Sequence, residues 1–308
     1  MQVDHLHRSR QATVREVVSF EGIGLHSGAQ CRVRVSPGGE NTGIVFRRWN
    51  GDRINHSVLG PTEIAEATII ASPVSVVRSN HGTTIANDFG ASIATIEHLM
   101  AAFAILRVDN AVVDVFGPEI PILDGSAAPF VVGIRKAGLR SQKAARNSIL
   151  IEEPILIEDG ARSFSVEPAE TFSLEISIVF DDCFIGQQTL SITLSDEDMI
   201  DRLASARTFC RLNEVDALRQ AGLIQGGSLD NSIVVDGERV LNRDALRDPE
   251  EFVLHKALDV IGDLYLLGAP ICGAVRAIRP GHDLNCRAAL AIDRRAGAVS
   301  NATAAAHA

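Results

Sequence analysis

The segment DPEEFVLHKALDVIGD, residues 248–263, places a histidine and two aspartates at intervals of four residues. Side chains four apart lie on one face of an α-helix, so His255, Asp259 and Asp263 are expected to point to the same side. An imidazole and a carboxylate on adjacent turns can bind one metal ion, as in the helical motif of zinc proteases. The alternative is a solvated helix face on which these residues bind nothing.

A carboxylate directly precedes an imidazole at Glu97-His98, where a loop leads into an apolar helix. A catalytic zinc site takes three ligands from the protein and leaves one position for water, and hydrolysis also needs a general base. His98 suits the third ligand and Glu97 suits the base. The alternative is that Glu97 only complements the helix dipole in the first turn while His98 caps or packs.

A third candidate is His282, which follows the Arg-Pro-Gly turn at residues 279–281. Amide hydrolysis needs a proton for the leaving amine, and histidine titrates near neutrality, so His282 is a candidate general acid. Asp263, one turn beyond Asp259, would orient His282 through a hydrogen bond if the two segments meet in space. The alternative is a histidine on a solvent-exposed loop.

Strands and helices together must position these residues. In the first half, alternation of apolar and polar residues predicts strands over 31–35 and 111–116, and a helix over 93–104 that begins through a Thr95 cap. The polar stretch 140–147 then breaks the pattern, and we place a domain boundary there.

The second half repeats the order of strands followed by helices. Strands are predicted over 148–157 and 174–180, and the last helix opens at Asp248-Pro249 and closes near Gly268. The apolar residues 264–275 are too few to span a bilayer and are expected in the core. The Ala-rich tail, 294–308, lacks bulky apolar residues and is expected to be disordered. Two similar α+β layers are the predicted architecture.

Composition limits the classes of function. The 308 residues are 46% hydrophobic and 22% charged, enough to form about two domains with a sizeable core. Lys and Arg total 29 against 39 Asp and Glu, and this acidic balance argues against a broad basic surface for nucleic acid. The five scattered cysteines and the charged start of the chain, without the apolar segment of a secretory signal, favour a cytoplasmic protein with no transmembrane segment.

Seven ordered blocks resemble the bacterial UDP-3-O-acyl-N-acetylglucosamine deacetylases over residues 11–292. They are GIGLHSG (22–28), TIEHLMAA (95–102), DNAVVDVFGPEIPILDGSAAPF (109–130), SARTF (205–209), LIQGGSLDNSIVVD (223–236), HKALDVIGDLYLLG (255–268) and PGHDLN (280–285). The resemblance implies zinc-dependent removal of the acetyl group from UDP-3-O-(3-hydroxyacyl)-N-acetylglucosamine, giving UDP-3-O-acyl-glucosamine and acetate, in lipid A biosynthesis. Two alternatives stay open: a zinc amidase acting on another acylated sugar nucleotide, and a silent binding paralogue, which the intact proton-transfer residues disfavour.

The resemblance also implies a role for each matching residue. One Zn²⁺ per chain is implied, and Fe²⁺ is a possible occupant in the cell because two histidines and an aspartate can also bind iron. The implied residues are His98, His255 and Asp259 for the metal, Glu97 as base, His282 as proton donor with Asp263 orienting it, Thr208 near the developing oxyanion, Lys256 and Phe180 at the UDP portion, Phe209 at the sugar face, and His26 in a motif near the substrate.

The implied architecture is two related α+β domains, each layering helices on a sheet, with the active site between them. They would cover residues 1–139 and 148–293. Residues 212–236 are similar to the insert that shapes a hydrophobic passage for the acyl chain, and the alternative is an ordinary core-packing helix and strand. The expected partner is the small UDP-sugar lipid alone, and we expect a monomer.

The chain departs from the family pattern at two points. After Phe180 the family has Asp-His-Pro, and this chain has Asp-Asp-Cys at 181–183, which affects the loop on the nucleotide side. Cys210 stands where a glycine is usual. A cysteine near zinc is a potential extra ligand, although packing as a small apolar residue is the simpler expectation.

Overall fold

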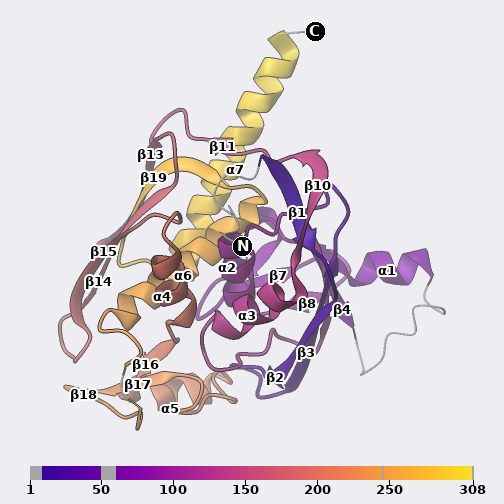
Figure 1. The fold of residues 1–308 in the computed structure, drawn as a ribbon. Coiled ribbons are helices and arrows are strands. Elements are labelled where there is room, and N and C mark those ends of the chain that lie inside the picture. Colours follow the sequence, from indigo (N-terminus) through magenta and orange to yellow (C-terminus); the bar gives the residue numbers. More distant parts are fainter. Residues whose placement is uncertain (1–8, 50–59, 245, 307–308) are drawn as a thin grey trace.

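The computed structural model describes residues 9–49, 60–244 and 246–306 (Figure 1). The expectation for the start of the chain falls mostly on residues 1–8, outside this range. Helices and sheets are both present, so the α+β class predicted from the sequence is confirmed. Helices α2 (Glu97–Leu106) and α6 (Glu251–Leu264) lie in the middle of the molecule with one large sheet on each side, whereas α1 (Pro61–Ala67) lies outside the sheets (Figure 1).

The first sheet has the strand order β2-β3-β9-β4-β5. Its central strand, β9, is antiparallel to β3 and parallel to β4. Helix α2 precedes β9 and helix α3 follows it. The strands predicted over 31–35 and 111–116 are confirmed as parts of β3 and β9. The elements are β2 (Val18–Ile23), β3 (Gln30–Pro37), β4 (Ile44–Trp49), β5 (Thr68–Ile70), α2 (Glu97–Leu106), β9 (Ala111–Phe116) and α3 (Ala128–Ala137).

The second sheet repeats this arrangement. Its order is β12-β13-β19-β14-β15, and β19 is antiparallel to β13 and parallel to β14. Helix α6 precedes β19 and α7 follows it, so α6 is the counterpart of α2. The elements are β11 (Ile149–Leu150), β12 (Ile155–Asp159), β13 (Arg162–Pro168), β14 (Ser173–Phe180), β15 (Gly186–Ile192), α6 (Glu251–Leu264), β19 (Ile271–Ile278) and α7 (His282–Ala306).

Smaller elements complete the described chain. Residues of the 212–236 segment form α5 and β17, beside β16 and β18 in a three-stranded sheet. The bounds are β1 (Arg10–Val14), α1 (Pro61–Ala67), η1 (Pro73–Ser75), β6 (Val76–Arg78), β7 (Thr84–Ala86), β8 (Ser92–Ile93), β10 (Leu139–Ala145), α4 (Glu197–Ser205), β16 (Phe209–Arg211), α5 (Leu212–Gln220), β17 (Ile233–Asp236), β18 (Arg239–Val240) and η2 (Tyr265–Leu267).

The contact between α2 and α6 brings the two halves together. Leu99 and Phe103 of α2, and Leu254 and Leu258 of α6, are fully buried in the common core. A side chain at Gly262 of α6 would clash with the backbone carbonyl of Glu97, so only glycine permits this close approach of the two helices. The central helices therefore meet at the residues that the sequence marks for chemistry.

Several expectations about the elements need correction. Helix α2 begins at Glu97 with Ile96 as N-cap, because the Thr95 hydroxyl donates to the Glu119 carboxylate and cannot cap the helix. The polar stretch 140–147 is mostly strand β10, since pairing with β1 satisfies its backbone. The strand expected over 148–157 is two separate strands, β11 and β12.

The end of the chain also differs from expectation. Helix α6 is not the last helix, because α7 follows it and continues to Ala306. Residues 294–306 are thus helical in the structure where disorder was expected. Alanine has the highest helix propensity of the amino acids, so a segment without a hydrophobic face can still adopt this conformation. The boundaries of the two domains stay predictions.

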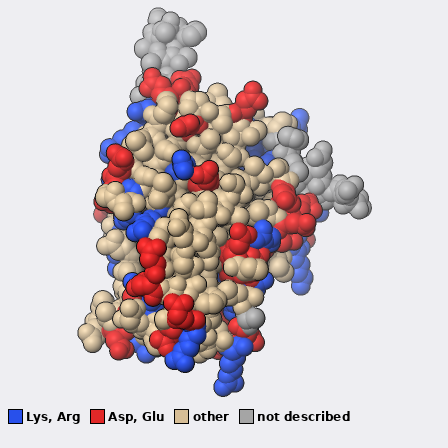
Figure 2. Space-filling view, turned by 90° about the vertical axis from the view of Figure 1, so that its left-hand side faces the viewer, with Lys and Arg blue, Asp and Glu red and all other residues tan. Residues whose placement is uncertain are grey.

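The surface agrees with the charge count. On the face in Figure 2, basic and acidic side chains are interspersed, and neither type forms one broad patch there. In the described part of the chain, every helix is too short or too polar to cross a membrane.

Candidate metal centre and active site

His98, His255 and Asp259 meet at the contact between α2 and α6. One ligand atom from each residue lies within 4.8 Å of the others, and all three side chains are buried. Asp259 Oδ1 is 3.4 Å from Nε2 of His255 and 3.9 Å from Nε2 of His98. The alternative of a solvated helix face is therefore wrong, because these polar side chains face one another inside the protein.

The three residues fit a divalent metal ion by an independent criterion. Asp259 Oδ1 is buried and has no hydrogen-bond partner among the described residues, and an unsatisfied buried carboxylate oxygen is costly. The ring of His255 is held through Nδ1, 3.1 Å from the carbonyl of Ala206, so its Nε2 lone pair is left for a ligand bond. A divalent cation would accept lone pairs from all three groups.

Burial prepares the ligands for metal binding. It lowers the pKa of His98 to about 3 and also lowers the pKa of His255, because the charged imidazole loses hydration. Burial disfavours ionisation of Asp259, but His255 and Lys256 outweigh it and hold its pKa below the usual range. Two neutral imidazoles and one carboxylate are the protonation states that a metal requires.

Glu97 lies at the start of α2, next to the candidate ligand His98. Its side chain is buried, and Oε2 accepts a hydrogen bond of 2.9 Å from the backbone N–H of Thr83. Burial raises the pKa of Glu97 to about 7, and the carboxylates of Asp263 and Asp259 add to the shift. A carboxylate with a pKa near neutrality is suited to general-base catalysis.

His282 begins α7 and faces the same site. Its Nε2 is 3.9 Å from Glu97 Oε1 and 3.8 Å from Asp259 Oδ2, and its side chain is only 11% exposed. Nδ1 is 2.8 Å from Asp263 Oδ2, the contact expected from the helix spacing. Burial opposes protonation, but Asp263, Asp259 and Glu97 raise the pKa of His282 to about 10. The exposed-loop alternative is therefore wrong.

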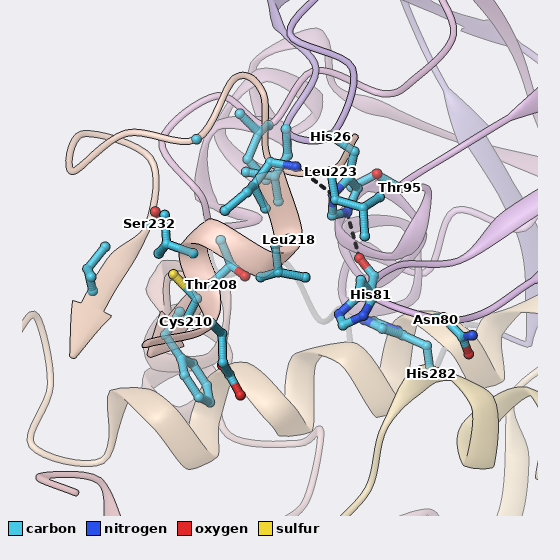
Figure 3. Close-up of a pocket in the computed structure, with 18 of the residues that line it drawn as sticks. His26, Asn80, His81, Thr95, Thr208, Cys210, Leu218, Leu223, Ser232 and His282 are labelled. Carbon is cyan, nitrogen blue, oxygen red and sulfur yellow. Dashed lines mark hydrogen bonds between the residues drawn. The ribbon is translucent and has the colours of Figure 1, made fainter. Parts of the chain in front are cut away.

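A cavity of about 1100 Å³ opens beside these residues. Thr208, Cys210 and Ser232 lie on one side, and Asn80, His81 and His282 on the other (Figure 3). Much of the wall comes from residues 212–236. Helix α5 has no buried residue and is not a core helix, whereas Ile233 and Val235 of β17 are buried in the core. The apolar side chains that it adds include Leu212, Val215, Leu218, Leu223, Ile224 and Leu229.

The residues predicted to contact the substrate differ in their positions relative to the cavity. Lys256 lines the cavity with Nζ 2.8 Å from Asp259 Oδ2 and 5.4 Å from the centroid of the Phe209 ring. Phe180 packs on Phe209 with centroids 5.8 Å apart, but the described residues that line the cavity do not include it. His26 lines the cavity and uses both ring nitrogens within the protein: Nε2 donates to the carbonyl of His81, and Nδ1 accepts from the backbone of Ile224 (Figure 3).

The two departures from the family pattern can be located. Cys210 lines the cavity, and burial raises the pKa of its thiol. The metal-binding group found among the described residues does not contain it. In the loop after β14, Asp182 pairs with Arg211 at 3.2 Å, and this ion pair links the loop to β16.

The sequence did not point to three supporting residues. Thr83 and Asn285 donate to Asp263 at 2.6 and 2.9 Å, and Thr83 also binds Glu97. Gly262 permits the helix contact. A glycine inside a helix costs about 1 kcal/mol relative to alanine, so its position between Asp259 and Asp263 was a usable signal of close packing. Thr83 lies far from any motif and gave no such signal.

Gly262→Ala is expected to lower metal affinity and turnover. The new methyl group would clash with the Glu97 carbonyl and approach Ala101 N at 3.2 Å, so α2 must move and carry Glu97 and His98 away from α6. A displacement of about 1 Å at catalytic groups can cost on the order of 10²-fold in rate. Metal content and kcat of purified protein measure the effect. The control is Gly60→Ala, where φ is −77° and a methyl group meets only the Glu63 carboxylate at 3.7 Å; equal activity of both variants would contradict the packing role.

The fold and the site define a metal-dependent hydrolase, in which a buried group that could hold one cation lies beside a carboxylate and an imidazole. Residues 11–293 match the family model of UDP-3-O-acyl N-acetylglycosamine deacetylase. This chain belongs to that family.

Curated relatives match over most of their lengths. The protein of Phenylobacterium zucineum (strain HLK1) is 46% identical over 275 residues, which cover 89% of this chain and 90% of the relative. That of Acidithiobacillus ferrooxidans (strain ATCC 53993 / BNL-5-31) is 44% identical over 278 residues, covering 90% of this chain and 87% of the relative. Both are named UDP-3-O-acyl-N-acetylglucosamine deacetylase.

Proposed function

We propose that this chain hydrolyses the acetamide of UDP-3-O-(3-hydroxyacyl)-N-acetylglucosamine, releasing acetate and the free amine in lipid A biosynthesis. The observation that carries the proposal is the meeting of His98, His255 and Asp259, with Glu97 and His282 nearby, at one side of a large cavity with an apolar wall. Family membership and the names of the relatives support the same reaction. The resident metal in this proposal is one zinc ion per chain.

The protein residues divide the proton transfers. When bound by His98, His255 and Asp259, zinc would supply Lewis acidity that polarises the amide carbonyl and activates water. Glu97 accepts the proton of the attacking water, since its raised pKa makes it a base near neutrality. His282 donates a proton to the leaving nitrogen, and Asp263 fixes its ring through Nδ1. The Thr208 hydroxyl, on the cavity wall, is the proposed donor to the developing oxyanion.

The cavity wall has a part with charged and aromatic side chains and an apolar part, and these suit the two ends of the substrate. Lys256 offers a cation for the UDP portion, Phe209 offers an aromatic face for the sugar, and Phe180 and His26 support these contacts. Residues 212–236 form the passage for the acyl chain, which is supported by their apolar side chains on the cavity wall.

The division of the chain is part of the same proposal. Domains over 1–139 and 148–293 would act as the two walls of the site, and the repeated sheet order of the two halves supports this. Strand β10, which pairs with β1, then joins the first domain. We further propose a cytoplasmic monomer, in which the five free cysteines are compatible with a reducing compartment.

The direct test of the proposal is deacetylation of the UDP-linked substrate, with metal content measured on the same sample. Chelation should abolish activity, and one equivalent of zinc should restore it, because the residues alone do not supply the Lewis acid. An acylated sugar nucleotide with another sugar serves as the comparison substrate. Full activity in rigorously metal-free protein, or preference for the other sugar, would contradict the proposal.

A substrate that lacks the 3-O-acyl chain is expected to lose kcat/KM heavily. Each buried CH₂ contributes about 0.8 kcal/mol, so removing four buried methylenes costs about 3 kcal/mol, on the order of 10²-fold. The measurement compares both substrates on the unmodified enzyme and on Leu218→Ser, which makes the passage wall polar. Equal efficiency for the two substrates would exclude residues 212–236 as the acyl passage.

A further inference from the structure

The carboxylate of Glu119 is a buried charge that the proposed reaction does not use. Glu119 follows β9 and is only 1% exposed. It accepts hydrogen bonds from two segments far apart in sequence: the Thr95 hydroxyl at 2.8 Å, the backbone N–H of His26 at 3.0 Å, and the backbone and hydroxyl of Ser27 at 3.0 and 2.8 Å. Hydrogen bonds to an ionised acceptor are about twice as strong as neutral ones.

The first of these bonds fixes the start of α2. Thr95 has φ 57°, a left-handed conformation that is unfavourable for a β-branched residue and persists only when the surroundings impose it. The bond from its hydroxyl to Glu119 supplies that constraint. The next residues along the chain are Ile96, the N-cap of α2, then the base Glu97 and the ligand His98. A change in Thr95 would therefore be transmitted directly to both functional side chains.

The other bonds fix one wall of the acyl passage. Glu119 holds the backbone at His26 and Ser27, and the carbonyls of Leu25 and His26 accept hydrogen bonds from Gly226 and Gln225 at 3.0 and 3.2 Å. The ring of His26 links the carbonyl of His81 to the backbone of Ile224. The turn around His26 thus holds residues 224–226 of the proposed acyl passage through hydrogen bonds (Figure 3).

Glycines make this contact a close one. A side chain at Gly24 would collide with the Glu119 carboxylate, and one at Gly226 would collide with the Gly24 carbonyl. The passage segment, the 24–28 turn and Glu119 are therefore packed without room for adjustment. The same carboxylate touches the turn that begins α2 and the turn that supports the passage.

We propose that Glu119 is a positioning residue, which aligns Glu97 through Thr95 and at the same time holds the acyl passage through the turn at His26 and Ser27. Glu119 touches neither the metal ligands nor the reacting atoms in this role. The inference rests on the proposed deacetylation, because it assigns a function to the alignment of that site.

The central test is Glu119→Gln, which keeps the shape but turns one carboxylate oxygen into an NH₂ group facing hydrogen-bond donors. We expect kcat to fall on the order of 10-fold or more, as for a small misalignment of a catalytic group, with metal stoichiometry near one. KM for the acylated substrate should rise as well, whereas KM for the analogue without the acyl chain should change little. A fall confined to protein stability, with kcat and KM unchanged, would overturn the proposal.

The matched control is Asp109→Asn. Asp109 is also a buried carboxylate, 7% exposed, and it accepts hydrogen bonds from the Ala12 backbone and from Arg146. This substitution should lower Tm and leave kcat and KM unchanged. If both variants lose kcat equally, the loss reflects general destabilisation and the positioning role is wrong.

A double-mutant cycle with Thr95 tests whether Glu119 aligns Glu97 through the Thr95 hydroxyl. Thr95→Val removes the hydroxyl but keeps the β-branched shape, and it should reproduce the kcat loss of Glu119→Gln without the rise in KM. Combining the two should add little further loss in kcat, because they remove the same bond. Thr95→Ser keeps a hydroxyl and should restore most of kcat. Independent, additive losses would exclude a route through Thr95.

Amide hydrogen exchange gives a readout that does not depend on activity. Glu119→Gln should raise exchange in residues 24–28 and 224–226, because the turn and the passage segment lose their common support, and Asp109→Asn should not. If the unmodified chain fails to deacetylate the substrate while this exchange pattern holds, the proposed reaction is wrong and the support by Glu119 stands. Unchanged exchange in both segments would overturn the support itself.

Discussion

Asp259→Ala is expected to remove both the bound metal and the activity, whereas Asp263→Ala keeps the metal and slows turnover. The two aspartates lie one turn apart on α6, yet they face different partners. Asp259 Oδ1 faces the imidazoles of His255 and His98 and has no hydrogen-bond partner in the described chain. Asp263 binds His282, Thr83 and Asn285. Only the first is placed as a metal ligand.

The expected losses of activity follow from the positions of the two aspartates. Loss of a residue that orients a functional group typically costs about 10- to 100-fold in activity, which is the expectation for Asp263→Ala. Asp259→Ala should exceed that range, because two histidines remain where three ligands are needed and Lys256 loses its partner at 2.8 Å. Metal content and kcat/KM, measured on the same samples, distinguish the two variants. Equal metal loss in both would overturn the assignment.

Local spacing was sufficient to find the residues on each helix. His255, Asp259 and Asp263 share a face because side chains four apart must do so, and this spacing is independent of the rest of the fold. Glu97 and His98 were found by another local signal, a carboxylate directly before an imidazole at the start of an apolar helix. Strand β3 was also predictable, because its buried residues alternate with partly exposed ones. Strand β9 was predicted at the right place, although it is buried at every position except Val112.

Contacts between distant segments were not predictable from local pattern. Thr83 meets Asp263 across 180 residues, and Glu119 meets His26 across 93. Nothing in the sequence near Thr95 indicated that its hydroxyl would bind Glu119 instead of capping α2. The strand β10 was missed for the same reason. Its polar residues are stabilised by pairing with β1, which lies more than 120 residues earlier in the sequence. Tertiary contacts decide such segments, and local propensity does not.

The resemblance to a family supplied what spacing alone left open. The i, i+4 pair on α6 does not by itself exclude a solvated face, and His282 alone does not exclude an exposed loop. The burial of His255 and Asp259, each 2% exposed, removes the solvated face, and the His282 side chain, only 11% exposed, removes the exposed loop. The structure adds the mutual orientation of His282 and Glu97, the proposed acid and base.

The dependence of kcat/KM on pH is expected to be a bell set by Glu97 and His282. Glu97 must be deprotonated to accept a proton, and burial raises its pKa to about 7, so activity should fall as the pH drops below that value. His282 must be protonated to donate, and the surrounding carboxylates outweigh burial and raise its pKa to about 10, so activity should fall as the pH rises above that value. The plateau should lie between the two.

Variants assign each limb of the bell. Glu97→Ala should lower kcat on the order of 10²-fold or more with metal retained and should remove or shift the acidic limb, and His282→Ala should cost a similar factor and remove or shift the basic limb. The assignment must come from the variants, because Glu97 Oε1 and His282 Nε2 are 3.9 Å apart and interacting groups titrate as a pair. If His282→Ala kept near-normal turnover and an unchanged basic limb, His282 would not be the acid. Glu97 would then carry out both proton transfers: it would accept a proton from water and donate that proton to the leaving amine.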